Sequence, residues 1–232
     1  MKDLNLIELT DLEKRYGKKE ALTGINLTIG RGKIIGLLGP NGSGKTTLIK
    51  LLNGLLQPTS GEIKVNGKAP GVDSKKIISY LPDKMYFFED FYEDFDRKKA
   101  EGMCETLKIN TEAKIKSLSK GNKEKVQLVL VMCRKAQLYL LDEPIAGVDP
   151  AARDFILDTI LNNYNEEGTV IISTHLIADI EKIMDEVIFI KEGNIVTYKS
   201  ADDLREESGK SIDALFREIF HTDVYRGGDE AC

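Results

Sequence analysis

The stretch GPNGSGKTT, residues 39–47, decides the fold of this 232-residue chain. It matches the pattern G-x-x-x-x-G-K-[ST] and lies between an apolar run, KIIGLLG (33–39), and TTLIKLL (46–52), which predicts a helix. Glycines let consecutive backbone N–H groups converge on phosphate oxygens, and the N-terminus of the following helix adds positive potential. The sequence therefore predicts a phosphate-binding loop and a nucleotide site, with a glycine-rich turn that binds nothing as the weaker alternative.

Two side chains of this loop have expected chemical roles. Lys45 is expected to reach the β- and γ-phosphates, and the hydroxyl of Thr46 is expected to ligate Mg²⁺. Kinases, GTPases, helicases and transport motors share such a loop, so residues elsewhere must decide what happens to the nucleotide. The candidate nucleotide-binding residues of the loop are Gly39, Pro40, Asn41, Gly42, Ser43, Gly44, Lys45, Thr46 and Thr47.

Two more apolar runs, LYLLDEP (138–144) and TVIISTH (169–175), are typical of strands covered on both faces of a parallel sheet. In such sheets ligands gather beyond the carboxyl ends of the strands. There Asp142 is expected to complete the metal shell, and Glu143 to orient and deprotonate the attacking water. His175 is placed to contact a γ-phosphate or that water. The alternatives are solvated carboxylates and a surface or core histidine.

The remaining patterns indicate an α/β fold. LNLIEL (4–9) and GINLTI (24–29) alternate like antiparallel strands with one wet face, and helical spacing predominates from Lys84 to Ala136. EVIFIKEGNIVTY (186–198) predicts a hairpin that turns at Gly193-Asn194. Two stretches with helical character follow the hairpin.

One domain is expected, with three parts. Residues 1–83 and 137–200 are expected to form a nucleotide-binding α/β core, with a mainly parallel sheet and an N-terminal antiparallel β part. Residues 84–136 are expected to form an inserted helical subdomain, and residues 201–232 the C-terminal helices and tail.

Composition argues against several classes of protein. The net charge is −5 and the 33 lysines and arginines are scattered, which disfavours a nucleic-acid binder. The longest apolar run, VQLVLVMC (126–133), is far below the roughly 18 residues that a membrane span needs, and no secretion signal opens the chain, so we expect a cytosolic product. Cys104, Cys133 and Cys232 form no C-x-x-C pair, which argues against a zinc knuckle or a disulfide framework.

A second phosphate-binding pattern occurs in LSKGN (118–122), where a serine and a glycine open a helical stretch. With this motif, the loop at 39–47, LYLLDEP, AGVD (146–149) and STH (173–175), essentially the whole chain resembles the ATP-binding subunit of ABC transporters. In that family these are the Walker A, signature, Walker B, D-loop and switch-histidine motifs. The resemblance implies a P-loop NTPase core with a RecA-like sheet, ATP as the nucleotide, and a transmembrane permease as partner.

The resemblance also explains why there are two phosphate motifs. In the family two subunits meet head to tail, and the signature helix of one covers the γ-phosphate bound by the other. Ser119 would cap that helix and donate to phosphate, and Gly121 would permit close approach, while Lys120 and Asn122 replace the family's usual glycine and glutamine. Asp149 matches the D-loop aspartate. A homodimer and a heterodimer with a related subunit are both open.

Two further positions are assigned by resemblance. Tyr16, in KRYG, matches the aromatic residue that stacks on adenine, with plain packing as the alternative. Asp83, in ISYLPD, stands where the family has the Q-loop glutamine, and we hypothesise that it joins Thr46 and Asp142 as a metal ligand. Six aromatic residues from Tyr86 to Phe95 form either the small core of the helical subdomain or a socket for a helix of the permease.

The resulting prediction is an ATPase subunit with Lys45, Glu143 and His175 as catalytic residues and Mg²⁺ as cofactor. By ATP-dependent dimerisation it would drive a separate permease at the cytoplasmic face of the membrane, and it would bind no nucleic acid. The short interval between Asp83 and Ser119 resembles prokaryotic two-component exporters. The alternatives are a catalytically weak, nucleotide-gated half of a heterodimer and a soluble ABC ATPase without a transport role.

Overall fold

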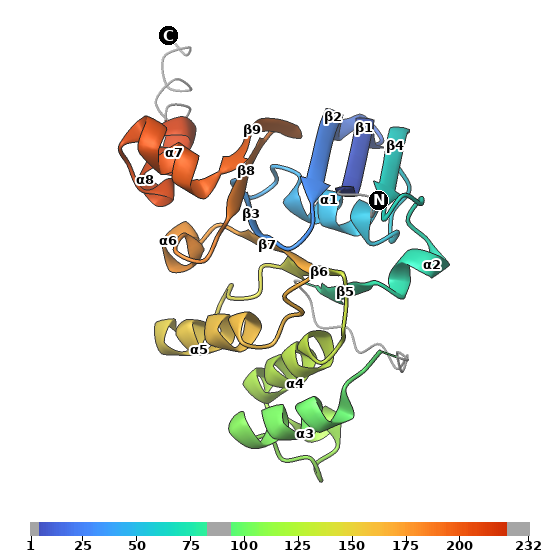
Figure 1. Ribbon diagram of the computed structural model, residues 1–232, viewed down its shortest axis with the longest axis vertical. Coiled ribbons are helices and arrows are strands. Elements are labelled where there is room, and N and C mark those ends of the chain that lie inside the picture. The colour runs from blue at the N-terminus through green and yellow to red at the C-terminus, as the bar shows by residue number, and fades with distance from the viewer. Residues whose placement is uncertain (1–4, 83–93, 222–232) are drawn as a thin grey trace.

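The computed structural model describes residues 5–82 and 94–221, which form two sheets with helices around them (Figure 1). The strands are β1 (Asn5–Tyr16), β2 (Lys19–Gly30), β3 (Ile34–Leu38), β4 (Ser60–Val65), β5 (Ile78–Leu81), β6 (Leu138–Asp142), β7 (Thr169–Thr174), β8 (Glu186–Lys191) and β9 (Asn194–Ser200). The helices are α1 (Lys45–Leu52), α2 (Val72–Lys75), α3 (Arg97–Thr106), the 3₁₀ turn η1 (Ile115–Ser117), α4 (Lys120–Met132), α5 (Pro150–Leu161), α6 (Ile177–Ile180), α7 (Ala201–Ser208) and α8 (Ile212–His221).

The larger sheet has the strand order β5-β6-β7-β3-β8-β9. Its first five strands are parallel, and β9 runs antiparallel to β8. Every residue of β3, β6 and β7 is buried, as their continuous apolar runs predict for strands covered on both faces. The predicted α/β class with a mainly parallel sheet is confirmed. Because β3, β6 and β7 are neighbours, the polar residues that follow each of them meet at one edge.

The smaller sheet is antiparallel, in the order β2-β1-β4, and confirms the predicted N-terminal β part. Buried and exposed residues alternate along the second half of β2, as expected when one face meets a core and the other meets water. Leu48, Ile49, Leu51 and Leu52 of α1 lie in one apolar cluster with residues of both sheets. Helix α1 is therefore packed between the sheets (Figure 1), which fixes the loop at its N-terminus.

The hairpin of β8 and β9 is present, but its turn lies one residue earlier than predicted. Glu192 and Gly193 form the two-residue turn with φ angles of 48° and 78°, and Asn194 already pairs with Lys191. Two successive positive φ angles are those of a type I′ turn, whose twist matches that of the strands. Gly193 cannot be replaced cheaply, because an added Cβ would lie 2.8 Å from the carbonyl oxygen of Ala21.

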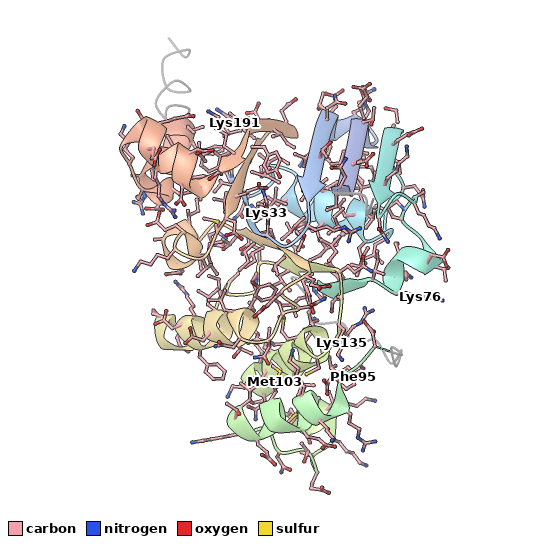
Figure 2. The ribbon with its side chains drawn as sticks, viewed as in Figure 1. Lys33, Lys76, Phe95, Met103, Lys135 and Lys191 are labelled. Carbon is pink, nitrogen blue, oxygen red and sulfur yellow. The ribbon has the colours of Figure 1, made fainter. Side chains whose placement is uncertain are left out.

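Helices α3 and α4 lie at one end of the molecule (Figure 1), in the segment predicted to be helical. Met103 of α3, labelled in Figure 2, is buried, and its sulfur lies 3.4 Å from the sulfur of Cys133 at the end of α4. Of the six aromatic residues from Tyr86 to Phe95, only Phe95 is among the described residues, and it packs, partly buried, against the main core. Over residues 5–82 and 94–221, no helix combines the length and apolar character that a membrane crossing requires.

Arg134 links the helical region of α3 and α4 to the larger sheet. Its guanidinium is almost fully buried and forms a bidentate ion pair with the carboxylate of Asp94, with hydrogen bonds of 3.0 and 3.2 Å. It also donates to the carbonyl oxygens of Lys75, Lys76 and Ile78, at the end of α2 and the start of β5. A buried charge is tolerated when it is paired and its donors are satisfied, so Arg134 fixes where the helices sit on the sheet.

Candidate active site

The loop 39–47 connects β3 to α1 and depends on glycine at two positions. Gly44 caps α1 with φ = 114°, and an added Cβ there would lie 2.7 Å from the carbonyl oxygen of Ala21. A Cβ on Gly39 would lie 2.3 Å from the carbonyl oxygen of Ile190. Both backbone positions exclude larger residues. The loop therefore directs the free N–H groups of the first turn of α1 outward, where a phosphate can bind.

Lys45 is buried at the centre of this loop, with 6% of its side chain exposed. Its ammonium donates to the carbonyl oxygens of Gly39 (2.7 Å) and Pro40 (3.2 Å) and lies 3.8 Å from Oε1 of Glu143. Burial lowers the pKa of Lys45, while the neighbouring carboxylates of Glu143 and Asp142 act in the opposite direction. The loop thus holds an ammonium whose partners are two backbone carbonyl oxygens and one carboxylate, which the oxygens of an incoming triphosphate can replace.

Asp142 ends β6 and is buried next to two hydroxyl groups. Thr46 Oγ1 donates to its Oδ1 at 3.1 Å, and Ser173 Oγ donates to the same oxygen at 2.6 Å. A hydroxyl and a carboxylate are hard oxygen donors, and Mg²⁺ is usually bound by one or two such protein groups together with phosphates of the substrate. Thr46 and Asp142 therefore fit a Mg²⁺–nucleotide complex. No group of three or more His, Cys, Asp or Glu residues suited to a metal occurs within the described part of the chain.

Glu143 and His175 are in contact. His175 Nδ1 lies 3.0 Å from Oε2 of Glu143, so the ends of β6 and β7 do meet as the sequence predicts. Sequence reasoning missed Ser173, whose backbone carbonyl and hydroxyl oxygens both accept from the backbone N–H of Glu143, at 3.0 and 3.1 Å. Ser173 is paired with Asp142 across the sheet. The available signal was a polar residue near the end of a mainly apolar strand.

Lys45, Thr46, Glu143 and His175 open onto one cavity of about 340 Å³. Tyr16 stands at its rim with 47% of its surface exposed, and the ammonium of Lys14 lies 5.3 Å from the centre of its ring. An exposed ring at a cavity rim argues for a stacking surface and against plain packing of Tyr16. The residues that line the cavity are Tyr16, Lys19, Ala21, Asn41, Gly42, Gly44, Lys45, Thr46, Thr47, Glu143, Ala146 and His175.

The signature residues are not among those lining this cavity. Ser119 caps α4, as predicted, and its Oγ accepts from the backbone N–H of Asn122 at 3.3 Å. Lys120 has 85% of its side chain exposed and lies 3.9 Å from Glu124, while Gly121 is exposed. The N-terminus of α4 is therefore open to another molecule.

Five predicted residues remain. Asp149 is exposed directly before α5 and does not line the cavity. Gly39, Pro40 and Ser43 belong to the loop but are not among the residues that line the cavity; Gly39 and Ser43 are buried, and Pro40 is exposed. Asp83 lies outside the described residues, so its role as a metal ligand stays a prediction.

Comparison with known proteins identifies the family. The ABC transporter family profile matches residues 22–146. The chain belongs to the ABC transporter family. It is 33% identical to an ABC transporter ATP-binding protein of Methanocaldococcus jannaschii over 215 residues, which span 85% of this chain and 79% of that protein.

Other members of the ABC transporter family agree with this assignment. The SkfA peptide export ATP-binding protein SkfE of Bacillus subtilis is 29% identical over 211 residues, 83% of this chain and 88% of that one. A solved structure of an ATP-binding subunit of an ABC transporter superimposes with a TM-score of 0.78 at 26% identity, covering 92% of this chain and 98% of that chain. The chain is thus an ABC ATP-binding protein, from a family of ATPases that work with transmembrane partners.

Proposed function

We propose that this chain is the ATP-hydrolysing subunit of an ABC transporter and drives a separate transmembrane permease. The observation that carries the proposal is the convergence of Lys45, Glu143 and His175 on one cavity, with Tyr16 at its rim. A cation for the phosphates, a carboxylate that can accept a proton and an imidazole that can contact phosphate or water are groups suited to ATP hydrolysis, and here they come from three separate segments of the chain.

ATP would be bound by its two ends. The ring of Tyr16 offers a stacking surface for adenine, and the N–H groups at the start of α1 receive the phosphates. Lys45 would exchange its contacts with the carbonyl oxygens of Gly39 and Pro40 for stronger contacts with phosphate oxygens. The same exchange would free Glu143 from the ammonium 3.8 Å away.

Thr46 and Asp142 are the residues that would hold Mg²⁺, which supplies positive charge to neutralise the β- and γ-phosphates. Asp83 is the proposed additional ligand. The change Asp83→Asn should then alter the Mg²⁺ concentration that gives half-maximal ATPase activity. An unchanged Mg²⁺ dependence would remove Asp83 from the metal shell.

Glu143 is placed to accept the proton of the attacking water. Its backbone is fixed by Ser173 and its carboxylate by His175, which leaves the carboxylate at the cavity surface in one defined position. His175, with 44% of its side chain exposed, can contact both this carboxylate and a γ-phosphate at the cavity surface. The proposed catalysis therefore depends on the position of the Glu143 carboxylate relative to the imidazole of His175.

A second ATPase subunit would complete the site. Ser119 and Gly121 at the open end of α4 are proposed to cover the γ-phosphate bound by the partner, with Asp149 near the interface and with Lys120 and Asn122 completing the motif. ATP would then belong to the dimer interface, and dimerisation would depend on nucleotide occupancy. Either a second copy or a related subunit could supply the other half.

The permease would hold the subunit at the cytoplasmic face of the membrane. The relative named for peptide export supports the direction of transport as export, in agreement with the short interval between Asp83 and Ser119. The scattered charge gives no reason to expect nucleic acid as a partner.

The direct test is Glu143→Gln, which keeps the shape of the side chain and removes the base. We expect ATP binding to persist, steady-state hydrolysis to fall at least about a hundredfold, and an ATP-dependent dimer to accumulate on gel filtration. Glu218→Gln, on α8, alters an exposed ion pair with Lys210, which precedes that helix; it is the matched control and should change neither measurement. Undiminished hydrolysis in the Glu143→Gln protein contradicts the proposed mechanism, and a poorly active wild type supports the nucleotide-gated alternative.

The shared site is tested by mixing two inactive variants. Lys45→Ala removes the phosphate cation, and Ser119→Arg blocks the end of α4. A mixed dimer contains one site in which both residues are intact, so mixing should recover part of the activity that each variant lacks. If no mixing ratio restores hydrolysis, each chain works alone.

A further inference from the structure

We infer that Arg153 is a positioning residue for the Glu143–His175 pair, because it ties the loop that follows β6 to the helix that follows β7. The inference rests on the proposed function, since it assumes that Glu143 and His175 act together on ATP. Arg153 itself lies in α5 and is not among the residues that line the cavity.

The two segments leave the sheet side by side. One begins at Glu143 and ends where α5 starts, and the other passes from His175 into α6. The first point of contact between them is the Glu143–His175 pair at 3.0 Å. The helices at their far ends, α5 and α6, are also neighbours (Figure 1).

Arg153 makes a second point of contact between the same two segments. Its Nη1 lies 2.9 Å from Oδ2 of Asp179 in α6. Its Nε donates to the carbonyl oxygen of Val148, also at 2.9 Å, in the loop that begins with Glu143. One guanidinium therefore binds a side chain of one segment and the backbone of the other, which its fixed arrangement of donors allows.

The two segments differ in how firmly the core holds them. Helix α6 is anchored by Ile177 and Ile180, which are 1% and 0% exposed. In the loop, Ile145 is fully buried, but Gly147 and Asp149 are exposed, so the second half of the loop has little packing of its own. Arg153 thus attaches the less buried half of the loop to an anchored helix. Its side chain is 23% exposed and that of Asp179 is 33% exposed, so water screens the ion pair only in part.

Two points of attachment between the loop after β6 and the segment after β7 restrict rotation of the loop, whereas a single point would not. With Arg153 in place, the loop cannot swing about the Glu143–His175 contact, and the carboxylate of Glu143 keeps its direction toward the cavity. Small displacements of a catalytic group reduce the rate of the chemical step strongly. Binding of ATP should change little, because neither Arg153 nor Asp179 lines the cavity.

The experiment compares steady-state ATPase kinetics of the full-length protein and its variants. Arg153→Ala should lower kcat about tenfold and change KM for ATP less than about twofold. The kcat of Arg153→Lys should lie between those of Arg153→Ala and the wild type, because an ammonium lacks the fixed planar arrangement of donors with which the guanidinium binds both acceptors. Asp179→Ala should lower kcat by as much as Arg153→Ala does. The kcat of the double variant should be no lower than that of either single variant, because both substitutions remove the same ion pair. Arg217→Ala removes a comparable contact of 2.8 Å with Asp213 on α8 and should leave kcat unchanged.

Thermal unfolding of each variant separates positioning from stability. If Arg153→Ala and Arg153→Lys keep kcat within about twofold of the wild type, or lose only thermal stability, the inference is wrong. If Arg153→Ala does not fold, Arg153→Lys and Asp179→Asn decide by the same criterion. Glu143→Gln is measured in the same assay. If that variant keeps full activity, the proposed function is wrong. If it is inactive while the Arg153 variants have normal kcat, only the role of Arg153 is wrong.

Discussion

The substitution Ser173→Ala tests how the site holds Asp142. Ser173 is fully buried, and its hydroxyl donates to Oδ1 of Asp142 at 2.6 Å, a length typical of a charge-assisted bond. Hydrogen bonds to charged groups contribute about 1.5–3 kcal/mol, so the substitution should lower the free energy of unfolding by about that amount. For a chain of this length the midpoint of thermal unfolding should fall by about 3–12 °C.

Ser79→Ala is the matched control. Ser79 is equally buried in β5 and donates to the carbonyl oxygen of Val131 at 2.8 Å, so the same hydroxyl is removed from a neutral partner. That change should lower the free energy of unfolding by only about 0.5–1.5 kcal/mol. Urea unfolding of both variants at one pH measures the difference directly.

The two variants should also differ in their response to Mg²⁺. Loss of Ser173 Oγ leaves Thr46 as the remaining hydroxyl on Oδ1 of Asp142, so the carboxylate can rotate away from its position. Removing such a partner of a metal ligand weakens metal affinity about 10- to 100-fold, and the Mg²⁺ concentration for half-maximal ATPase should rise accordingly. Ser79→Ala should not alter it. Equal losses of stability and identical Mg²⁺ curves for the two variants would refute this account of Asp142.

Three more predictions concern single positions. Tyr16→Ala should weaken ATP binding by about 1–3 kcal/mol, as measured by calorimetric titration, whereas Tyr16→Phe should bind ATP as the wild type does. If Tyr16→Ala binds ATP as tightly as the wild type, Tyr16 does not stack on adenine. Gly44→Ala should abolish ATP binding, because the φ of Gly44 is 114° and the new Cβ would lie 2.7 Å from the carbonyl oxygen of Ala21. The control is Gly102→Ala on α3, where an added Cβ meets nothing within 4 Å. It should keep ATP binding and raise the free energy of unfolding by about 0.5–1 kcal/mol. Burial raises the pKa of Cys133 to about 11 from 9.0, so at pH 9 only about 1% of it is thiolate; iodoacetamide should modify it only after unfolding, and rapid modification of the native protein would contradict its burial.

Much of the fold can be predicted from the sequence because burial leaves a pattern in it. Continuous apolar runs identified β3, β6 and β7, and their polar ends identified Asp142, Glu143 and His175. The runs do not state which strands are neighbours, so the order β6-β7-β3 came only from the structure. The hairpin turn was misplaced by one residue because Gly193 is flanked by two residues that can each adopt a positive φ, and pairing of Asn194 with Lys191 decided between them.

Residues that act through others were harder to find. Ser173 and Arg153 belong to no phosphate or metal pattern, and their importance depends on distances across the chain: 31 positions separate Ser173 from Asp142, and 26 separate Arg153 from Asp179. In the sequence, Ser173 is one of three successive polar residues that end an apolar run, and Arg153 is one charged residue among many, so neither hydrogen bond can be inferred from the sequence.

The adjacent carboxylates of Asp142 and Glu143 show why backbone geometry, and not residue type, assigns chemical roles at this site. Asp142 is the last residue of β6, and its side chain is buried against Thr46 and Ser173. Glu143 has φ = 53°, a left-handed conformation that is uncommon for a residue with a side chain. That turn of the chain takes Glu143 out of the strand and brings its carboxylate to the cavity, within 3.0 Å of His175. The strain, of order 1 kcal/mol, is offset by the two bonds from its N–H to Ser173. The two carboxylates therefore stand in different surroundings, which supports the proposed division of roles between a metal ligand, Asp142, and a base for the attacking water, Glu143.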